Sequence, residues 1–382
     1  MKPIYLDNGA TSFPKAPGVS AAMARYLDEI GANINRGTYQ SAIDASLTVL
    51  ETRTKLASLF GFGGSENHVV FTPGSTEGLN LILRGFLRPG DHVIVSSLEH
   101  NAVMRPLTDL AERGVTFSRI PADRDGVTNP RDLLPLIRPE TRLVLVSHAS
   151  NVSGTLFPLE EAAELCRARG LPLAVDGAQT AGHFPIDFDA LHLAALCVPG
   201  HKGLLGPQGI GAVLLHPEFA RQLSPIVTGG TGSASDSERQ PPYLPDKFES
   251  GTQNLPGIFG LHAALKYVES RGVDALRRRE AALTGALLDA LRDLPLRAVG
   301  PKDPARRVGV VSLDFAGQDN AAAAFRLESE FGILTRCGLH CAPNAHKTLE
   351  TFPQGTVRLS VGHATTEADV AAAAEAIRTV CR

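Results

Sequence analysis

The sequence predicts an α/β protein: a large domain with a mostly parallel sheet flanked by helices, plus a smaller C-terminal α/β domain. The first reason is that short apolar runs alternate with stretches of helical length between residues 68 and 215, as in βαβ units. The second is that polar residues directly follow several of those runs, where parallel strands present ligand sites. The third is a change of character near residue 260, where Ala/Leu/Arg-rich helical sequence begins.

Composition excludes several classes of protein. At about 150 residues per domain, 382 residues correspond to two or three units, and 43% hydrophobic residues can fill a large core. A formal net charge of −3 argues against nucleic-acid binding. No apolar run approaches the roughly 18 residues of a membrane span. The N-terminus has no apolar segment typical of a signal peptide, so we expect a cytoplasmic protein with no membrane partner.

The five cysteines are odd in number and have no zinc-finger spacing. This usage fits a reducing compartment better than a disulfide scaffold, and we expect no metal site. The cysteines are Cys166, Cys197, Cys337, Cys341 and Cys381.

The elements follow in order. Residues 1–20 are rich in Pro and Gly and predict irregular chain, and helical periodicity covers residues 41–60. Further strands are expected over residues 68–71, 92–96, 115–120, 143–147, 171–175, 194–198 and 210–215. Helices are expected over residues 79–87, 102–113, 131–137 and 159–169. Right-handed crossovers place the loops after these strands at one edge of the sheet.

Residues 224–247 predict an irregular, mobile loop near a functional site. Beyond it we expect helices over 256–270, on to about 293, and over 320–331 and 367–379. Strands are expected over 308–315, 332–335 and 356–361. The predicted division is a large domain at 16–258 and a small domain formed by 1–15 and 259–382, with the N-terminal arm completing the small domain.

Two strand ends carry an acid and a lysine. Asp176 ends one apolar run, and Lys202 follows the next one in the segment Pro199-Gly200-His201-Lys202. A pyridoxal phosphate (PLP) enzyme needs this pair, because the lysine binds the aldehyde covalently and the carboxylate keeps the pyridine nitrogen protonated. An Asp at a strand end alone more often caps a loop, and a lone Lys is more often a solvated charge.

A third strand end predicts a phosphate site. The segment Thr72-Pro73-Gly74-Ser75-Thr76-Glu77-Gly78 joins a strand to a helix N-terminus, whose free N–H groups and positive dipole favour an anion. Ser75 and Thr76 add hydroxyl donors. The simpler interpretation is an N-cap by Ser75.

Together these segments resemble the class V aminotransferase family, cysteine desulfurases in particular. The matching motifs are Y-L-D-N-G-A-T from Tyr5, G-S-T-E from Gly74, E-H at Glu99, S-N at Ser150, D-G-A-Q at Asp176, G-H-K at Gly200 and F-E-S-G-T-Q-N from Phe248. The resemblance covers nearly the whole chain. It implies the PLP-dependent transferase fold type I.

The resemblance also implies residue roles. His100 would stack on the pyridine ring, and Asn151 and Gln179 would contact its phenolate oxygen. Ser75, Thr76 and His201 would bind the phosphate. Thr252 would reach the phosphate of a neighbouring subunit, which implies a homodimer. Arg36 lies in a polar loop matching an R-G segment of the family, but a solvated arginine is nearly as good an interpretation, so it is left out of the site.

Pro199 departs from the family pattern, which usually has Ser or Thr there to contact the phosphate. Proline offers neither a hydroxyl nor an N–H. A lost charge-assisted contact costs on the order of 1–3 kcal/mol. We therefore expect weaker PLP retention than in relatives, and Pro199→Ser should strengthen it.

Cys341 decides the predicted activity. Free cysteines are usually buried, but Cys341 follows His340 in a loop with Gly and Pro. The R-x-G-x-H-C-A-P pattern from Arg336 resembles the active-site loop of type II cysteine desulfurases and selenocysteine lyases. That likeness implies that Lys202 removes the α-proton of L-cysteine, Cys341 takes the sulfur as a persulfide, and Arg358 anchors the substrate carboxylate.

Cys337 is a second departure from the pattern. We hypothesise a persulfide-resolving thiol there, against the simpler interpretation of a bystander. Unchanged oxidation sensitivity in Cys337→Ala would remove the hypothesis.

Several readings of the function stay open. The first is a cysteine desulfurase that passes sulfur from L-cysteine to an acceptor protein, for iron–sulfur cluster assembly, thiocofactor or tRNA sulfur chemistry. Selenocysteine lyase and cysteine-sulfinate lyase share the same fold. A class V transaminase or epimerase would not use Cys341 covalently, and a non-catalytic sulfur-relay protein would not need Lys202, Asp176, His100 and Cys341 together.

Overall fold

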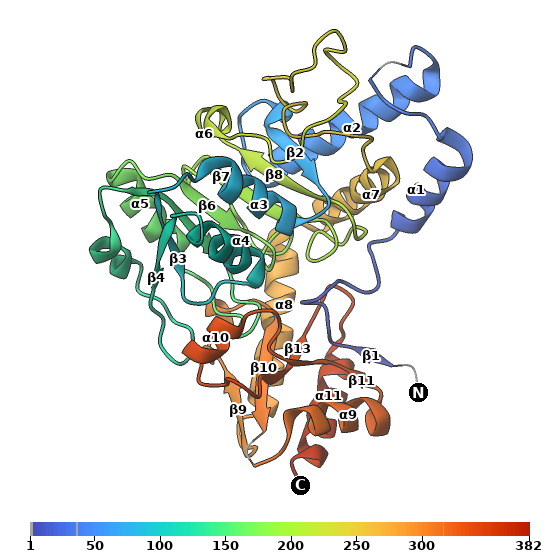
Figure 1. The fold of residues 1–382 in the computed structure, drawn as a ribbon. Helices are drawn as coiled ribbons and strands as arrows, with labels where there is room; N and C mark the ends of the chain where they lie inside the picture. Colours follow the sequence, from blue (N-terminus) through green and yellow to red (C-terminus); the bar gives the residue numbers. More distant parts are fainter. Residues whose placement is uncertain (1–2, 36, 316) are drawn as a thin grey trace.

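A computed structural model describes residues 3–35, 37–315 and 317–382, so Arg36 lies outside the described residues. Figure 1 shows a large unit built on one sheet and, below it, a smaller unit made mainly of the C-terminal part of the chain. The N-terminal strand lies beside this smaller unit. The expected α/β fold with a large, mostly parallel sheet and a smaller C-terminal unit is confirmed.

The large sheet has the strand order β2-β8-β7-β6-β5-β3-β4. Its strands are β2 (Val69–Thr72), β3 (His92–Ser96), β4 (Thr116–Ile120), β5 (Thr141–Ser147), β6 (Leu173–Asp176), β7 (Ala195–Pro199) and β8 (Gly211–Leu215). Neighbours from β7 to β4 pair in parallel, whereas β8 is antiparallel to both β7 and β2. Because β8 alone reverses, the other strands end at the same edge of the sheet.

Helices bury both faces of this sheet. Side chains of a strand alternate between faces, so Val144 and Val146 of β5 join one core while Leu143 and Leu145 join the other. The first core is covered by α2 (Gln40–Leu59), α5 (Leu159–Ala168) and α7 (Leu255–Arg271). The second is covered by α3 (Ser75–Phe86), α4 (Asn101–Ala111) and α6 (Pro217–Gln222).

The smaller unit contains an antiparallel sheet of order β12-β13-β10-β9. Its strands are β9 (Leu296–Val299), β10 (Val310–Phe315), β12 (Arg336–Gly338) and β13 (Thr356–Ser360), and its helices are α8 (Val273–Ala290), α9 (Asn320–Phe331), α10 (Pro343–Thr348) and α11 (Glu367–Val380). The N-terminal arm adds β1 (Ile4–Tyr5), which pairs in parallel with β11 (Ile333–Leu334). The N-terminal arm therefore contacts the smaller unit, and the expected division of the chain into domains stays a prediction.

Some short elements escape sequence patterns. They are α1 (Val19–Arg25), which begins inside the segment expected to be irregular, and α6, β9, β12 and α10. Each has at most seven residues, too few for a hydrophobic period to emerge. The helix expected over residues 79–87 begins earlier, at Ser75, and the one over 131–137 is a 3₁₀ helix, Pro130–Leu136. Within the described ranges, no helix is both long and apolar enough to cross a membrane.

Candidate active site

An open cleft of about 670 Å³ lies at the edge of the large sheet where the parallel strands end. It is lined by most of the residues singled out from the sequence: Ser75, Thr76, His100, Asn151, Asp176, Gln179, His201 and Lys202. They come from loops after five different strands, which the fold brings together. Thr252, Cys341 and Arg358 do not line this cleft and are described separately below.

One end of the cleft is suited to an anion. Gly74, rather than Ser75, occupies the N-cap position of α3, and no side chain caps the helix, so its first N–H groups face the cleft entrance. The Ser75 hydroxyl and His201 Nδ1 are buried with no hydrogen-bond partner within the described part of the chain. Buried polar atoms normally have partners, so these groups fit a bound phosphate. Pro199, the last residue of β7, lines the same cleft and offers no donor.

Asp176 and Lys202 face each other across neighbouring strands. Asp176 ends β6, which pairs in parallel with β7, and Lys202 follows β7 by three residues. Burial raises the pKa of Asp176, and the nearby Lys202 opposes this. Burial likewise lowers the pKa of Lys202 to about 8, with Asp176 opposing. The acid and the lysine therefore share one desolvated site, as a PLP cofactor would require.

His100 sits at the N-cap of α4, and its ring is oriented by the backbone. Its Nδ1 accepts a hydrogen bond from the N–H of Ala102 at 3.0 Å, so the neutral ring carries its proton on Nε2. Burial lowers the pKa of His100 to about 4, and the charges of Lys202 and Arg358 add to the effect. A neutral imidazole can stack on an aromatic ring without adding a further cation to the site.

The two amide side chains expected at the cofactor, those of Asn151 and Gln179, lie at the wall of the cleft. Each donates a hydrogen bond to a backbone carbonyl in another part of the chain. Asn151 Nδ2 donates to the carbonyl of His340 at 2.6 Å, and Gln179 Nε2 donates to the carbonyl of Gly9 at 3.0 Å. Both side chains are buried. Each therefore links the large unit to the Cys341 loop or to the N-terminal arm, and their contact with a phenolate oxygen stays a prediction.

Cys341 projects from a loop between β12 and α10 that is fastened to the large unit. Its carbonyl accepts a hydrogen bond from the N–H of Asn101 at 2.8 Å, and Asn344 Nδ2 donates to the carbonyl of Ser97 at 3.0 Å. His340 and Cys341 adopt left-handed φ values of 48° and 57°, which side chains disfavour. Cys341 is exposed. The strained loop thus presents a free thiol next to the segment that carries His100.

His340, the residue before this thiol, is buried. Its Nε2 is 3.0 Å from the hydroxyl of Thr356, and burial lowers its pKa to about 2. A neutral His340 shapes the loop and adds no positive charge beside Cys341.

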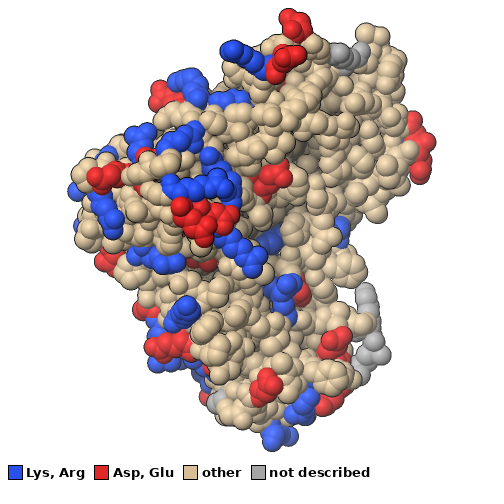
Figure 2. Space-filling view, viewed as in Figure 1, with Lys and Arg blue, Asp and Glu red and all other residues tan. Residues whose placement is uncertain are grey.

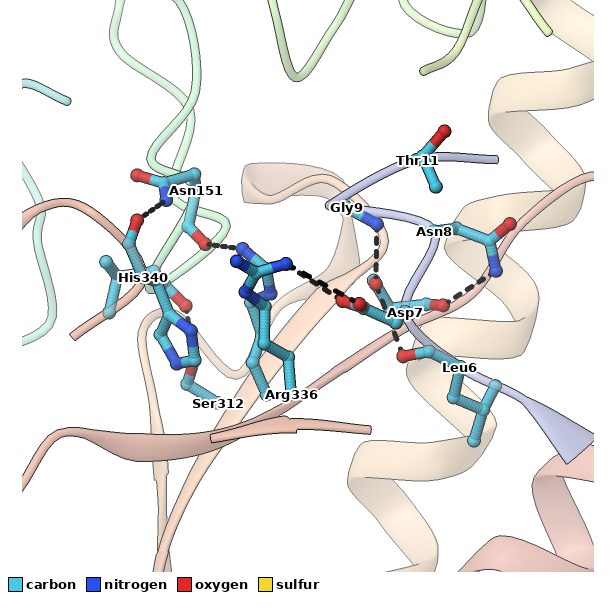
Figure 3. Close-up of polar contacts among 12 residues, drawn as sticks. Leu6, Asp7, Asn8, Gly9, Thr11, Asn151, Ser312, Arg336 and His340 are labelled. Carbon is cyan, nitrogen blue, oxygen red and sulfur yellow. Dashed lines mark hydrogen bonds and ion pairs between the residues drawn. The ribbon is translucent and has the colours of Figure 1, made fainter. Parts of the chain in front are cut away.

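Arg358 is buried on β13, next to the N-terminal arm. Its Nη1 donates to the carbonyl of Asn151 at 3.0 Å and its Nη2 to Asp7 Oδ1 at 3.0 Å. Arg336 of β12 approaches the same carboxylate, with Nη1 3.8 Å from Asp7 Oδ2. Figure 3 shows Asp7 and Arg336 pointing toward one another, and Asn151 toward His340.

Cys337 lies away from this group. Successive side chains of a strand point to opposite faces, and Cys337 packs against the core of the smaller unit while its neighbour Arg336 faces Asp7. Burial raises the pKa of the Cys337 thiol. This placement favours the bystander interpretation, and the persulfide-resolving role stays a hypothesis.

Thr252 lies on an exposed loop outside the cleft. The loop is anchored by Glu249, whose carboxylate receives two hydrogen bonds of 2.7 Å from the buried Arg53 of α2. Glu249 also accepts from the N–H of Phe71 at 2.6 Å. Among the described residues, Thr252 is not one of those that line the cleft.

The sequence did not single out Asp7, Arg336 or Glu99 as site residues. Glu99 is buried beneath the strand ends, where its carboxylate accepts hydrogen bonds from Ser96 and Ser147, and burial raises its pKa to about 7. Asp7 and Arg336 lie inside motifs used for other residues, and only the ion pairs of Asp7 with Arg358 and Arg336 mark them. The sequence offers one signal for these three site residues: each is a charged residue close to a residue that a motif had already identified.

Comparison with known proteins agrees with this geometry. The chain matches the class-V aminotransferase family over residues 4–372. It is 32% identical to a probable cysteine desulfurase of Methanothermobacter thermautotrophicus, covering 96% of this chain and 92% of the relative. It is 33% identical to a cysteine desulfurase of Serratia proteamaculans, covering 88% and 84%.

Two solved structures have the same fold. One is the apo structure of a cysteine desulfurase from Thermococcus onnurineus NA1, with a TM-score of 0.91, 30% identity and coverage of 99% and 94%. The other is the cysteine desulfurase CsdA (S-sulfonic acid) from Escherichia coli, with a TM-score of 0.88, 29% identity and coverage of 99% and 94%. The chain belongs to the class-V aminotransferase family, and its cofactor is PLP.

Proposed function

We propose that the protein is a PLP-dependent cysteine desulfurase, which converts L-cysteine to L-alanine and takes the sulfur onto Cys341. The observation that carries the proposal is the placement of an exposed thiol, on a strained loop, beside the segment that carries His100, a residue that lines the lysine-bearing cleft. An enzyme that only exchanged amino groups would have no use for such a thiol. The names of the relatives support the same activity.

The residues of the cleft fit PLP. The unpartnered Ser75 hydroxyl, His201 Nδ1 and the N-terminus of α3 suit the phosphate, and Asp176 suits the pyridine nitrogen. When bound, PLP supplies an electron-accepting ring that stabilises negative charge on the substrate Cα. Lys202, with its lowered pKa, is matched to taking the proton from that carbon near neutral pH.

Cys341 then acts as the sulfur acceptor. Its thiolate attacks the substrate sulfur, forming an S–S bond as the Cβ–S bond breaks, and the bonding electron pair remains with the three-carbon fragment that leaves as alanine. Only the thiolate is nucleophilic enough for this step. Arg358, and the backbone of Asn151 that holds it, would orient the substrate carboxylate.

The test follows sulfide and alanine together. Purified PLP-loaded protein is mixed with L-cysteine and a reductant, with Cys341→Ser alongside and Cys337→Ala as the matched cysteine control. Equal amounts of the two products, lost in Cys341→Ser and kept in Cys337→Ala, are expected. Sulfide production that survives in Cys341→Ser would contradict the role of Cys341.

Selenocysteine and cysteine sulfinate are the substrates to try next. Release of alanine from either at a much higher kcat/KM than from L-cysteine would assign the chain to a lyase of that substrate. A PLP spectrum that responds to amino acids, without alanine or selenide release, would indicate a transaminase.

We infer a homodimer from one face of α2. Tyr39, Ile43, Leu47 and Leu50 are spaced three or four residues apart and are 56%, 44%, 51% and 43% exposed. Figure 2 shows few charged side chains on the broad surface around this helix. The buried side of α2 carries Arg53, which anchors the Thr252 loop through Glu249. A second copy seated on α2 would lie close to that loop, consistent with Thr252 reaching its phosphate.

Sedimentation of the holoenzyme tests this inference. Leu47→Glu should shift the protein to a monomer and weaken PLP retention, because a charge cannot be buried unpaired in an apolar interface. Phe325→Glu, at another exposed apolar residue (69%), is the matched control and should stay dimeric. A monomeric wild-type protein that retains PLP would remove the inference.

Three further expectations stay predictions. A sulfur-acceptor protein would receive the persulfide from the exposed Cys341. A cytoplasmic location is expected from the sequence. The division at residues 15/16 and 258/259 is also a proposal, and the structure adds that α7 runs through the second boundary while packing against α1 and α2 of the large unit.

A further inference from the structure

Arg358 has a hydrogen-bonding capacity that the protein leaves unfilled. The residue is 2% exposed, and its guanidinium makes two hydrogen bonds, to the carbonyl of Asn151 and to Asp7. Its Nε is buried with no partner among the described residues. A guanidinium offers five N–H donors in a planar fork that suits a carboxylate. An open donor on a buried cation points to a ligand oxygen that is absent from the protein itself.

Asp7 reaches this fork from a distant part of the sequence. It lies on the N-terminal arm just after β1, and a bridge to Ser360 of β13 holds its backbone beside Arg358. The hydroxyl of Tyr5 donates to the Asp7 carbonyl at 3.2 Å, which fixes the turn further. The backbone is therefore held firmly, and the carboxylate is the part free to change partners.

The Asp7 carboxylate sits between two unequal arginines. Arg358 Nη2 is 3.0 Å from Oδ1 and its side chain is 3% exposed, whereas Arg336 Nη1 is 3.8 Å from Oδ2 and its side chain is 48% exposed. Figure 3 shows Arg336 directed at Asp7 from the neighbouring strand. Because Arg336 is long and solvated, a small rotation would bring it into direct contact with Asp7. The buried Arg358 has no such freedom.

The local charge balance leaves room for one more carboxylate. Arg336 and Arg358 carry two positive charges against the single negative charge of Asp7. Their field reaches the catalytic groups, since both arginines act on His100 and Lys202. A substrate carboxylate would bring this cluster to neutrality, and it would seek the same Arg358 donors that Asp7 now shares.

We propose that Asp7 is an internal competitor for the substrate carboxylate: it holds Arg358 in the absence of ligand and moves its ion pair to Arg336 when a ligand carboxylate binds. Asp7 thereby sets the affinity for amino acids without touching the reacting atoms, and it is a specificity-determining residue. The inference rests on the proposed function only in taking an amino-acid substrate.

The experiment is a binding titration of the PLP-loaded enzyme, followed by the cofactor absorbance. L-alanine and ethylamine are compared, because they share an amine and differ in the carboxylate. Asp7→Asn keeps the side-chain shape and an oxygen acceptor for Arg358 but removes the charge. The apparent Kd for L-alanine should fall about 3- to 10-fold, and that for ethylamine should not change. Asp28→Asn, an exposed aspartate elsewhere, controls for total charge and should leave both unchanged.

A second variant tests the exchange of partners. Arg336→Ala removes the alternative partner of Asp7, so L-alanine should bind more weakly, and this weakening should disappear in the Asp7→Asn background. An Arg336→Ala effect of equal size in both backgrounds would mean that Arg336 contacts the ligand itself, which overturns the exchange. Unchanged or weaker L-alanine binding in Asp7→Asn overturns the competition.

Failure of this inference is distinguishable from failure of the proposed function. L-alanine binding is measured without sulfur chemistry, so the Asp7 result stands even where no sulfide forms from L-cysteine. Conversely, if sulfide production is normal and Asp7→Asn binds L-alanine with the wild-type Kd, only the proposed role of Asp7 is rejected. A thermal melt of each variant excludes unfolding as the cause.

Discussion

The two halves of the site are built differently. The cofactor end lies on loops after consecutive parallel strands, and its residues Asp176, His201 and Lys202 come from 27 positions of sequence. The carboxylate end joins Asp7 of the N-terminal arm to Arg336 and Arg358 of the smaller unit, more than 300 positions away. The first half is anchored in one sheet, with Asp176 buried and His201 and Lys202 half-buried, whereas the second depends on contacts between separate parts of the fold. The proposed roles would therefore place cofactor binding and substrate discrimination under separate structural control.

The largest expected effect is a loss of stability in the framework that supports the cofactor end. Glu249→Gln leaves Arg53 as a buried, unpaired cation, and Arg53 and Glu249 side chains are only 5% and 4% exposed. We expect the free energy of unfolding to fall by about 3–5 kcal/mol, measured by urea denaturation. Glu375→Gln breaks the exposed pair with Arg378 and should cost less than about 0.5 kcal/mol. Equal losses in both variants would contradict the importance of the buried pair.

The second effect distinguishes a loss of catalysis from a loss of stability. Asp176→Asn should lower kcat on the order of 10²- to 10³-fold with little change in stability, because the neutral amide no longer holds a proton on the pyridine nitrogen. Steady-state alanine formation and a thermal melt measure the two quantities. Asp236→Asn, at an exposed aspartate, serves as the control. A kcat within a few-fold of wild type would show that Asp176 is not the partner of the cofactor ring.

The third effect concerns how tightly the phosphate end of the cleft retains PLP. Pro199→Ser restores an N–H and adds a hydroxyl at the end of β7, beside the cleft. A gained contact of about 1–3 kcal/mol corresponds to about 5- to 150-fold slower loss of PLP. Dialysis of the holoenzyme followed by cofactor absorbance measures the rate, with Pro139→Ser, at an exposed proline, as control. An unchanged rate would mean that Pro199 does not weaken the binding of the PLP phosphate.

The smallest effect is on the stability of the protein at acidic pH, and it depends on His148, which lies behind the cofactor end. Burial lowers the pKa of His148 to about 4, so the folded state keeps this ring neutral while the unfolded chain takes up a proton below about pH 6.5. Stability from His148 is thus present above pH 6.5 and is lost as the pH falls toward 4. Its contribution between pH 6.5 and 5 is about 1.5 kcal/mol.

His148→Asn should flatten the pH dependence of the unfolding free energy by this amount, measured by urea denaturation at several pH values. The surface variant His192→Asn should keep the wild-type slope. A slope that is unchanged in His148→Asn would show that the ring is already protonated in the folded state.

Much of the fold, in both units, could be predicted from the sequence. The strand over residues 92–96 and the helix over 320–331 were predicted with the bounds that the structure has. Long, regular periods made this possible. Short elements such as α6 and β12 were missed, because tertiary contacts rather than local pattern stabilise them.

The meeting of the cofactor-end residues in one cleft could also be predicted, since each lies at the end of an apolar strand or within a few residues of it, whereas their roles toward PLP stay predictions. Glu99, Asp7 and Arg336 could not, because no local pattern distinguishes a buried or paired charge from a solvated one. The expected placement of Thr252 at a neighbour's phosphate concerns a second chain and stays a prediction.

The sequence by itself determined the alternation of strands and helices, the acid and lysine at adjacent strand ends, and the cysteine in a Gly- and Pro-containing loop. These features are local, so hydrophobic periodicity and motif spacing report them directly. Only the tertiary structure decided that Cys341 is held against the His100 segment and that Arg358 and Arg336 share the carboxylate of Asp7. Such pairings depend on the burial and mutual distance of charges from distant positions, which the order of residues along the chain does not specify.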